Sequence, residues 1–365
     1  MRPKDLGEGE LSAWRDFQMS DPAFENPFLC PEFALAVGDQ RPAARVAVLE
    51  DGDGVAGFLP FEARRLGVGK PIGSGLCDYQ AVLHRPGLEW DPRALLAGCG
   101  LSVFEFDHLS AQQEPFVPHH AAVVPAPAMD LSRGFDAFIG DIRRRSRGFV
   151  KTTRRLQRKM ERELGPLEMV YDDPRPEAHE LVLAWKSAQY RRTGRPDLFG
   201  RGEVRDLVHD LLHRREGEFS CVCTTLSAGG RLVSGQINLH SPTMIASWVI
   251  AYDPGVAAYS PGGVHDLLLA EEAARRGIGL ISLGKGESMQ KGRLGTTTRM
   301  VAEGWVERPS VVSAMRRAVR TPARAAASSA LLSSARGMGP SQASTTAAAT
   351  TGPASGPMPA SSTPA

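Results

Sequence analysis

The order of strand-like and helix-like segments between residues 217 and 310 constrains the fold of this chain more than any other feature. Three consecutive strand patterns come first, at 219–226, 231–240 and 244–253, and a Gly-Gly turn separates the first two. A helical segment then ends at Gly277 and is followed by a strand, a polar stretch and a last strand-like segment, RMVAEGWVER. Three antiparallel strands, a helix, a further strand, a short helix and a last strand predict a mixed α+β domain.

The residues before this region predict two further parts. Apolar runs on either side of an Asp/Gly turn predict a hairpin at 44–64. Further strands at 80–84 and 101–106, with a helix near 92–98, complete a mixed N-terminal domain over 1–131. From 132 to 216 the pattern is that of a helical linker region that enters the second domain, 217–310. Ser132 is the expected cap of its first helix, and Gly217 is the expected stop of its last.

The composition changes abruptly near the end of the chain. From residue 321 onward, 38 of 45 residues are Ala, Ser, Thr, Pro or Gly. Such a segment buries too little apolar surface to offset its ordering entropy, so 321–365 is predicted to be a disordered tail. Residues 311–320 are expected to form a basic helical extension.

Charge and cysteine content restrict the partners, the metal sites and the cellular compartment that the sequence predicts. With 43 basic and 41 acidic side chains the net charge is only +2, so the overall charge does not point to nucleic acid as a partner. The five cysteines are too sparse for a disulfide scaffold, and Cys221 and Cys223 lack a partner pair at zinc spacing, so no metal site is predicted. The polar start and the lack of an 18-residue apolar run predict a cytoplasmic protein.

The segment 143–162 holds ten Lys or Arg residues and a single acid, Glu161. Leu156, Met160 and Leu164 recur every four residues, which places them on one helical stripe and most basic residues on the other faces. A solvated surface is one interpretation. The other is contact with an anionic partner, such as a nucleotide sugar, a lipid-linked glycan, a membrane surface or a polysaccharide synthase. Because only Phe149 interrupts the run, stacking on single-stranded nucleic acid is not expected.

Several motifs occur in a fixed order over roughly residues 10 to 310. They are NPFLCPEF at 26–33, GFLPF at 57–61, DYQ at 78–80, RKMERELG at 158–165, KSAQYRRTG at 186–194, AYDPGVAAYSPGG at 251–263 and LGKGESMQK at 283–291. Together they resemble the GNAT-related acetyltransferases described as CelD/BcsL-like, which are relatives of the FemABX peptidyltransferases. The resemblance implies an α+β (mixed α/β) fold of tandem GNAT-like domains, each a mixed, mostly antiparallel sheet flanked by helices, with a degenerate first copy.

The resemblance also implies an acyl-CoA, such as acetyl-CoA, as co-substrate, and no metal. Ser260, Pro261, Gly262 and Gly263 open a helix, and the free N–H groups at such a start can bind a phosphate. An ordinary helix start, with the serine as cap and the proline in the first turn, is the alternative. Residues 257–264 do not spell the usual GNAT pyrophosphate motif.

Three charged residues follow the penultimate strand, where the implied fold places groups that face the donor carbonyl. They are Lys285, which is counted with the donor site, Glu287 and Lys291. A lysine there can stabilise an oxyanion, and its alternative is a solvated surface loop. In the family a tyrosine usually precedes the lysine of this segment, whereas Gln290 stands here.

The candidate general bases are Asp78, Glu287 and His265, and Asp78 ranks first. Its loop, GSGLCDYQ, is rich in small residues that allow a ligand to approach the backbone. An aspartate that caps its own turn is the alternative reading. His265 is expected at the surface near the phosphate site, and Tyr259 is a candidate acid for the leaving thiolate.

The acceptor is expected to enter past Asp78 and a helix further along the chain. Lys186, Gln189 and Tyr190 are spaced i, i+3 and i+4, so they share one polar edge of that helix. Tyr79 and Gln80 are the other predicted substrate contacts.

These features predict an acyl-CoA-dependent N- or O-acyltransferase that acts on a sugar or glycan precursor in exopolysaccharide or cell-envelope biosynthesis. One alternative is aminoacyl transfer from aminoacyl-tRNA, as in the FemABX relatives. Another is a non-catalytic GNAT-like subunit of a polysaccharide synthesis complex.

Overall fold

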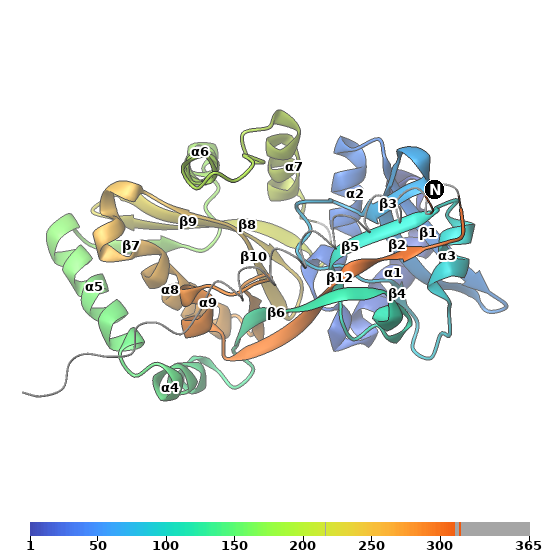
Figure 1. Cartoon of the computed structure of the whole chain (residues 1–365). Coiled ribbons are helices and arrows are strands. Elements are labelled where there is room, and N and C mark those ends of the chain that lie inside the picture. Colours follow the sequence, from blue (N-terminus) through green and yellow to red (C-terminus); the bar gives the residue numbers. More distant parts are fainter. Residues whose placement is uncertain (216, 311–313, 315–365) are drawn as a thin grey trace, which may run out of the picture. The chain divides into compact units, whose positions relative to one another are not determined.

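The strands of the molecule form one sheet, shown in Figure 1. The computed structural model describes residues 1–215, 217–310 and 314. The strands are β1 (Ala44–Asp51), β2 (Gly54–Arg64), β3 (Val68–Pro71), β4 (Leu83–His84), β5 (Val103–Ser110), β6 (His120–Asp130), β7 (Leu167–Val170), β8 (Ser220–Ala228), β9 (Arg231–His240), β10 (Met244–Tyr252), β11 (Leu280–Ser282) and β12 (Thr297–Glu307). Their order is β1-β2-β3-β5-β12-β6-β11-β10-β9-β8-β7, with β4 paired to β2.

Helices cover both faces of this sheet. They are α1 (Glu8–Ser20), α2 (Pro31–Gln40), α3 (Pro92–Gly98), α4 (Phe135–Arg145), α5 (Phe149–Leu164), α6 (Pro176–Arg192), α7 (Gly202–His213), α8 (Pro261–Arg275) and α9 (Met289–Leu294). Over the β7–β11 part, α6 and α7 lie on one face and α8, with α4 and α5 packed against it, on the other (Figure 1). Gly235 of β9 allows α6 to approach closely, since a Cβ there would lie 2.1 Å from Val182 Cγ2.

Most of the predicted N-terminal elements are present. The hairpin is confirmed as the antiparallel pair β1 and β2, and the helix near 92–98 is α3. The predicted strand at 80–84 is reduced to β4 and a bridge from Gln80 to Leu109. No sequence pattern had predicted α1, α2 or β6.

The C-terminal order is confirmed. The strands β8, β9 and β10 are antiparallel neighbours, α8 follows, and β11 runs parallel to β10. Two predicted helix ends are wrong. Ser132 does not cap α4, because the helix begins after Gly134 at φ 83° and the serine hydroxyl bonds Asp130. The helix α7 ends at His213, before Gly217.

The last strand connects the two halves of the sheet. β12 lies between β5 and β6, and β6 in turn pairs with β11. The prediction of a mixed α/β fold with a mixed sheet flanked by helices is confirmed. The division at 131 and 216 stays a prediction, and the predictions for 311–320 and 321–365 fall, apart from residue 314, outside the described residues.

Across the described parts of the chain, no helix is both long and apolar enough to span a bilayer.

Candidate active site

The parallel strands β10 and β11 separate soon after they meet. They pair only from Met244 with Leu280 to Ala246 with Ser282. Beyond that point β10 continues along β9, whereas the chain after β11 stays along β6, where Leu283 N–H donates to Pro127 O at 3.0 Å. Among the described residues, this part of β10 has no strand neighbour on the β11 side, so its backbone groups can bind a ligand.

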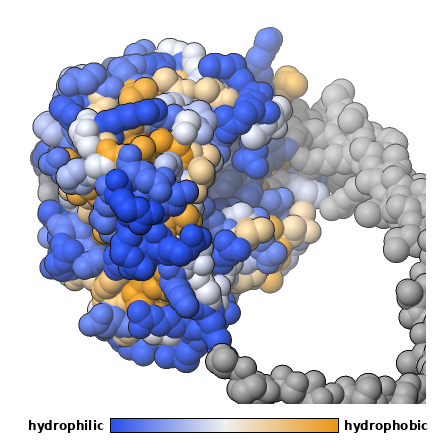
Figure 2. All heavy atoms as spheres, turned by 90° about the vertical axis from the view of Figure 1, so that its left-hand side faces the viewer, coloured by the Kyte–Doolittle hydropathy of each residue, from blue (hydrophilic) through white to orange (hydrophobic). Residues whose placement is uncertain are grey.

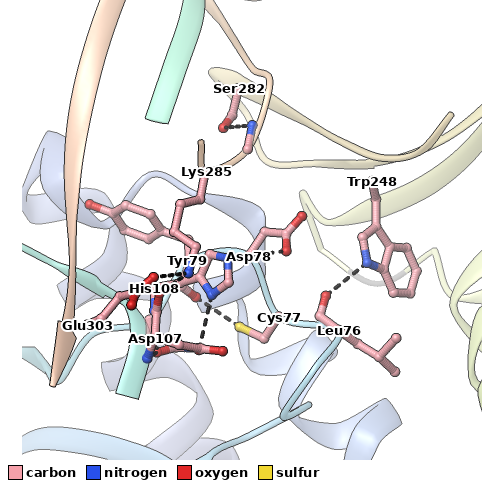
Figure 3. A network of polar contacts seen from close by, with 12 residues as sticks. Leu76, Cys77, Asp78, Tyr79, Asp107, His108, Trp248, Ser282, Lys285 and Glu303 are labelled. Carbon is pink, nitrogen blue, oxygen red and sulfur yellow. Dashed lines mark hydrogen bonds and ion pairs between the residues drawn. The ribbon is translucent and has the colours of Figure 1, made fainter. Parts of the chain in front are cut away.

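The loop after β3 carries Asp78 to this region. Gly73 and Gly75 give it two left-handed turns, at φ 65° and 84°, that other residues rarely adopt. The Trp248 indole of β10 donates to Leu76 O at 2.9 Å, which ties the loop to the separating strands. Figure 3 shows the loop meeting residues of β5, β10 and the segment after β11.

Asp78 lies beside a histidine that the sequence analysis missed. His108 Nε2 is 3.8 Å from Asp78 Oδ1, and its Nδ1 is 3.0 Å from Asp107 Oδ1 (Figure 3). Burial raises the pKa of Asp78 above its usual 3.8, although the charges of His108 and Lys291 oppose this shift. Its side chain is still 38% exposed, so the carboxylate is accessible to a reactant.

Asp107 holds the far side of the histidine ring. Burial alone would raise its pKa, but contacts with His108 and the Gln80 amide, and the charge of Lys285, lower the pKa of Asp107 to about 2. The His108 ring therefore lies between two carboxylates, those of Asp78 and Asp107. The Asp-His pair at the end of a strand was the only sequence signal for this arrangement.

Lys291 completes the centre from α9. Its ammonium donates to Gly284 O at 3.0 Å and to Lys285 O at 2.7 Å. A Cβ on Gly284 would lie 3.5 Å from Asp78 Oδ2 and 3.7 Å from Lys291 Nζ, so the two charges flank this glycine. Since an ammonium has three donors, one N–H remains for a ligand. Burial lowers the pKa of Lys291, and the Asp78 carboxylate opposes the shift.

Lys285 has a supporting position. Its ammonium donates to Asp107 O at 2.7 Å and pairs with Glu303 at 2.8 Å, which ties the segment after β11 to β5 and β12 (Figure 3).

The predicted edge of α6 faces the same centre. Lys186 Nζ donates to Ile250 O at 3.2 Å, on β10 beyond the point of separation, and lies 5.2 Å from the Tyr190 ring. Burial, with the charges of Arg195 and Lys291, lowers the pKa of Lys186 to about 8, and the charge of Asp78 opposes this shift. The Gln189 side-chain oxygen is buried and, within the described residues, has no hydrogen-bond partner.

The start of α8 has the geometry expected for anion binding. Ser260 is left-handed at φ 51°, its side chain makes no capping hydrogen bond, and Pro261 occupies the first turn. The first N–H to bond back into the helix is that of Val264, to Ser260 O, so the Gly262 and Gly263 N–H groups have no acceptor within the helix. A Cβ on Gly262 would meet only Tyr252, at 3.8 Å.

A buried carboxylate links this helix to α9. Asp266 accepts hydrogen bonds from the amides of Gln236, at 2.7 Å, and Gln290, the residue before Lys291. Burial raises its pKa to about 6, although both amides oppose this shift. Asp266 is only 3% exposed and was not predicted from the sequence.

Several predicted site residues lie elsewhere. His265 is buried rather than at the surface, and its ring contacts Ser234 and Thr224. Burial lowers its pKa to about 3, so it stays neutral. The Tyr259 hydroxyl donates to Glu163 of α5 at 2.9 Å. The proton that it would have to give to a leaving thiolate is therefore held in this hydrogen bond.

The two residues after Asp78 are part of the protein interior. Tyr79 is 4% exposed and donates to Ala23 O at 3.2 Å. Gln80 is equally buried and fixes β5 through both its amide groups. Their contact with substrate stays a prediction. Glu287 is an exposed residue of the loop before α9.

A cavity of about 630 Å³ lies away from these residues, in the N-terminal half. Two of its carboxylates, Asp21 and Asp91, accept backbone N–H groups and so cap turns. Within the described residues, no group of three or more His, Cys, Asp or Glu side chains is placed to hold a metal ion.

The comparisons with known proteins define the class of the central region. Residues 147–291 match the family model described as an acetyltransferase (GNAT) domain. The match contains α6, α8 and Lys291, so this part of the chain is similar to GNAT acetyltransferase domains, which supports an acyltransferase. No curated protein matches the sequence.

Solved structures share the fold over most of the chain. FemX is 8% identical, with a TM-score of 0.56 over 81% of this chain and 94% of its own. The C-terminal domain (DUF2156) of a putative lysylphosphatidylglycerol synthetase from Agrobacterium fabrum is 11% identical, with a TM-score of 0.53 over 86% and 96%. A conserved protein from Bacteroides thetaiotaomicron is 14% identical, with a TM-score of 0.51 over 82% and 97%. At these identities the likeness shows the fold alone.

Proposed function

We propose that this protein is an acyl-CoA-dependent N- or O-acyltransferase, with acetyl-CoA as the simplest donor, that acts on a sugar or glycan precursor in exopolysaccharide or cell-envelope biosynthesis. One observation carries the proposal. Asp78 and Lys291 flank Gly284 where β10 and β11 separate, so a base and a cation face one small space beside a free strand edge.

This arrangement suits direct attack of an acceptor on a thioester. The amine or hydroxyl adds to the carbonyl carbon, a C–N or C–O bond forms, and the C–S bond then breaks to release the thiolate. Asp78, with His108 beside it, receives the proton that the acceptor loses. The free N–H of Lys291 stabilises the negative charge that develops on the carbonyl oxygen.

The two ligands reach this centre from different elements. The Gly262 and Gly263 N–H groups at the start of α8 hold the phosphates of the donor. Lys186 and Tyr190 of α6 line the way for the acceptor, consistent with the effect of the Asp78 charge on the pKa of both. The five free cysteines favour a reducing, cytoplasmic setting.

The proposal is tested by thiol release from acetyl-CoA with a panel of amino sugars and nucleotide sugars. For an active acceptor, Lys291→Ala is expected to lower kcat by roughly 100-fold, because a preformed oxyanion donor contributes about that much. Lys4→Ala, at an exposed lysine of the N-terminal turn, is the control and keeps full activity. Equal kcat in Lys291→Ala and the wild-type protein contradicts the proposal.

Aminoacyl transfer from aminoacyl-tRNA is the second candidate. The structural likeness to FemX covers 81% of this chain, and the likeness to the putative lysylphosphatidylglycerol synthetase domain covers 86%. Both extend beyond residues 147–291. Thiol release with no panel member, together with transfer from a charged tRNA, would select this candidate. Failure of both assays would favour a non-catalytic subunit.

A further inference from the structure

A row of cations follows the outer face of α5. Lys151, Arg155, Arg158 and Arg162 are exposed and are spaced four, three and four residues apart, and Arg147 precedes them by one turn. We call these five residues the basic strip. Its helical part is about 16 Å long, because each residue advances an α-helix by 1.5 Å. Figure 2 shows the end of the molecule that carries α5, where a strongly hydrophilic surface is interrupted by hydrophobic patches.

The strip is separate from the packing of the helix. The opposite face of α5 buries Val150, Thr153 and Met160. Two of its other cations are engaged in ion pairs, Arg154 with Glu271 and Lys159 with Glu163.

The strip itself is mostly without neutralising acids. Only Arg162 has a carboxylate close by, that of Glu163 at 3.2 Å, whereas the other four have none within ion-pair distance among the described residues. Charge of one sign is therefore concentrated here although the whole chain carries only +2.

Further cations lie between α5 and α9, next to the candidate active site. Arg145 at the end of α4 donates to Gly295 O, directly after α9. Arg293 of α9 is exposed and lies over the Phe149 ring, 5.9 Å from its centroid, at the start of α5. Arg143 and Arg144 are exposed on the same end of α4.

An exposed apolar side chain accompanies these cations. Met289 is 73% exposed and stands four residues before Arg293, so both lie on the same side of α9. Lys291 is two residues on and bonds inward to Gly284 O and Lys285 O. One short helix thus separates the outer surface from the reactive centre.

We propose that the basic strip, Arg293 and Met289 dock this protein on an anionic lipid bilayer. Cations near such a surface are attracted to its phosphate groups, and a methionine can enter the interface between them. A nucleic-acid partner fits less well, because Phe149 packs beneath Arg293 and the strip offers no exposed aromatic side chain for stacking. The inference does not depend on the proposed reaction.

The test is flotation of the full chain with vesicles of 30% phosphatidylglycerol in phosphatidylcholine, beside vesicles of phosphatidylcholine alone. We expect binding only to the anionic vesicles, with a steep loss between 50 and 500 mM NaCl. The triple variant Lys151→Glu/Arg155→Glu/Arg158→Glu is expected to bind roughly 100-fold more weakly, because each cation near the surface contributes about fivefold.

A matched variant separates the strip from net charge. Arg65→Glu/Arg93→Glu/Arg201→Glu changes three exposed arginines elsewhere by the same total charge and is expected to keep binding within threefold. Equal loss in both triple variants would overturn the proposal. So would absent binding to anionic vesicles at 50 mM NaCl, or strip-dependent binding to bulk transfer RNA in the absence of vesicle binding.

Met289 is tested on its own. Met289→Ser is expected to weaken vesicle binding severalfold at every salt concentration, because the lost contact is apolar. Circular dichroism on each variant establishes that the fold is retained. Unchanged binding in Met289→Ser would remove the methionine from the docking surface.

Discussion

The α-carbon of Gly284 lies beside both charged groups of the candidate active site, Asp78 and Lys291. Its φ of 75° favours glycine, and the space above it lies between Asp78 Oδ2 and Lys291 Nζ. Gly284→Ala places a methyl group in that space, in contact with both groups. We expect kcat/KM for acyl transfer to fall by roughly 100-fold, since displacing a reactant by about 1 Å costs that much.

Gly286→Ala provides the control for backbone strain. Gly286 has a similar φ of 88°, but an added Cβ there would meet nothing within 4 Å. Both variants should lose about 1 kcal/mol of stability in thermal melts, while only Gly284→Ala loses activity. Equal activity losses would mean that the space above Gly284 is not where reaction occurs.

Asp78 should set the acidic limb of the pH–rate profile. A general base must be ionised, and burial raises the pKa of Asp78 above 3.8, so kcat/KM should rise with pH through a midpoint above that value. In Asp78→Asn this limb should disappear and the plateau should fall by about 100-fold. If Asp78→Asn keeps the limb and His108→Gln removes it, the base is His108.

Residue chemistry predicted part of this centre. Asp78, Lys291, Lys186 and Tyr190 were predicted from motifs, and the structure brings them to one place. Tyr79 is buried and donates to Ala23 O, so its contact with substrate stays a prediction. His108 was missed because its role depends on two carboxylates from different segments.

At the scale of elements, Asp266 joins α8, β9 and α9. Its carboxylate is the common acceptor of Gln236 and Gln290, so the first turns of α8 are tied to the helix that carries Lys291. Gln290, directly before Lys291, thereby helps to position α9.

This buried carboxylate predicts a pH-dependent stability. Because its folded-state pKa is about 6 against 3.8, its contribution is fully present below about pH 4 and is lost as the pH rises through 6. The shift corresponds to about 3 kcal/mol. Urea unfolding should therefore show the wild-type protein losing up to about 3 kcal/mol relative to Asp266→Asn between pH 4 and pH 8.

Glu89→Gln is the control for this measurement, because Glu89 is exposed. The stability difference between this variant and the wild-type protein should stay the same from pH 4 to pH 8. A constant stability difference between Asp266→Asn and the wild-type protein from pH 4 to pH 8 would contradict the account of this network.

Local sequence patterns predicted the helices and strands better than they predicted which strands are neighbours in the sheet. The run β8, β9 and β10 followed by α8 was correct, because turn residues and periodicity are local signals. The position of β12 between β5 and β6 was not foreseen, because which strand edge a terminal strand joins depends on contacts across the whole sheet.

At the scale of the molecule, the pairing of β12 with β5 and β6 brings the two parts of the candidate active site together. β12 and β6 connect the sheet half that carries Asp78 and His108 to the half that carries α8 and Lys291. The GNAT match covers only residues 147–291, so the proposed base comes from outside the matched domain. We infer that donor binding belongs to the C-terminal elements and that catalysis needs both halves.

Calorimetric titration of acetyl-CoA and desulfo-CoA into the full chain tests this account most directly. Gly262→Asp/Gly263→Asp places two carboxylates at the start of α8, where we propose that the donor phosphates bind, and Gly9→Asp/Gly52→Asp adds the same charge at two open positions. We predict saturable binding by the wild-type protein and the second variant, and none by the first. Absence of binding by the wild-type protein at millimolar ligand, or equal binding by all three proteins, would contradict the proposed donor site.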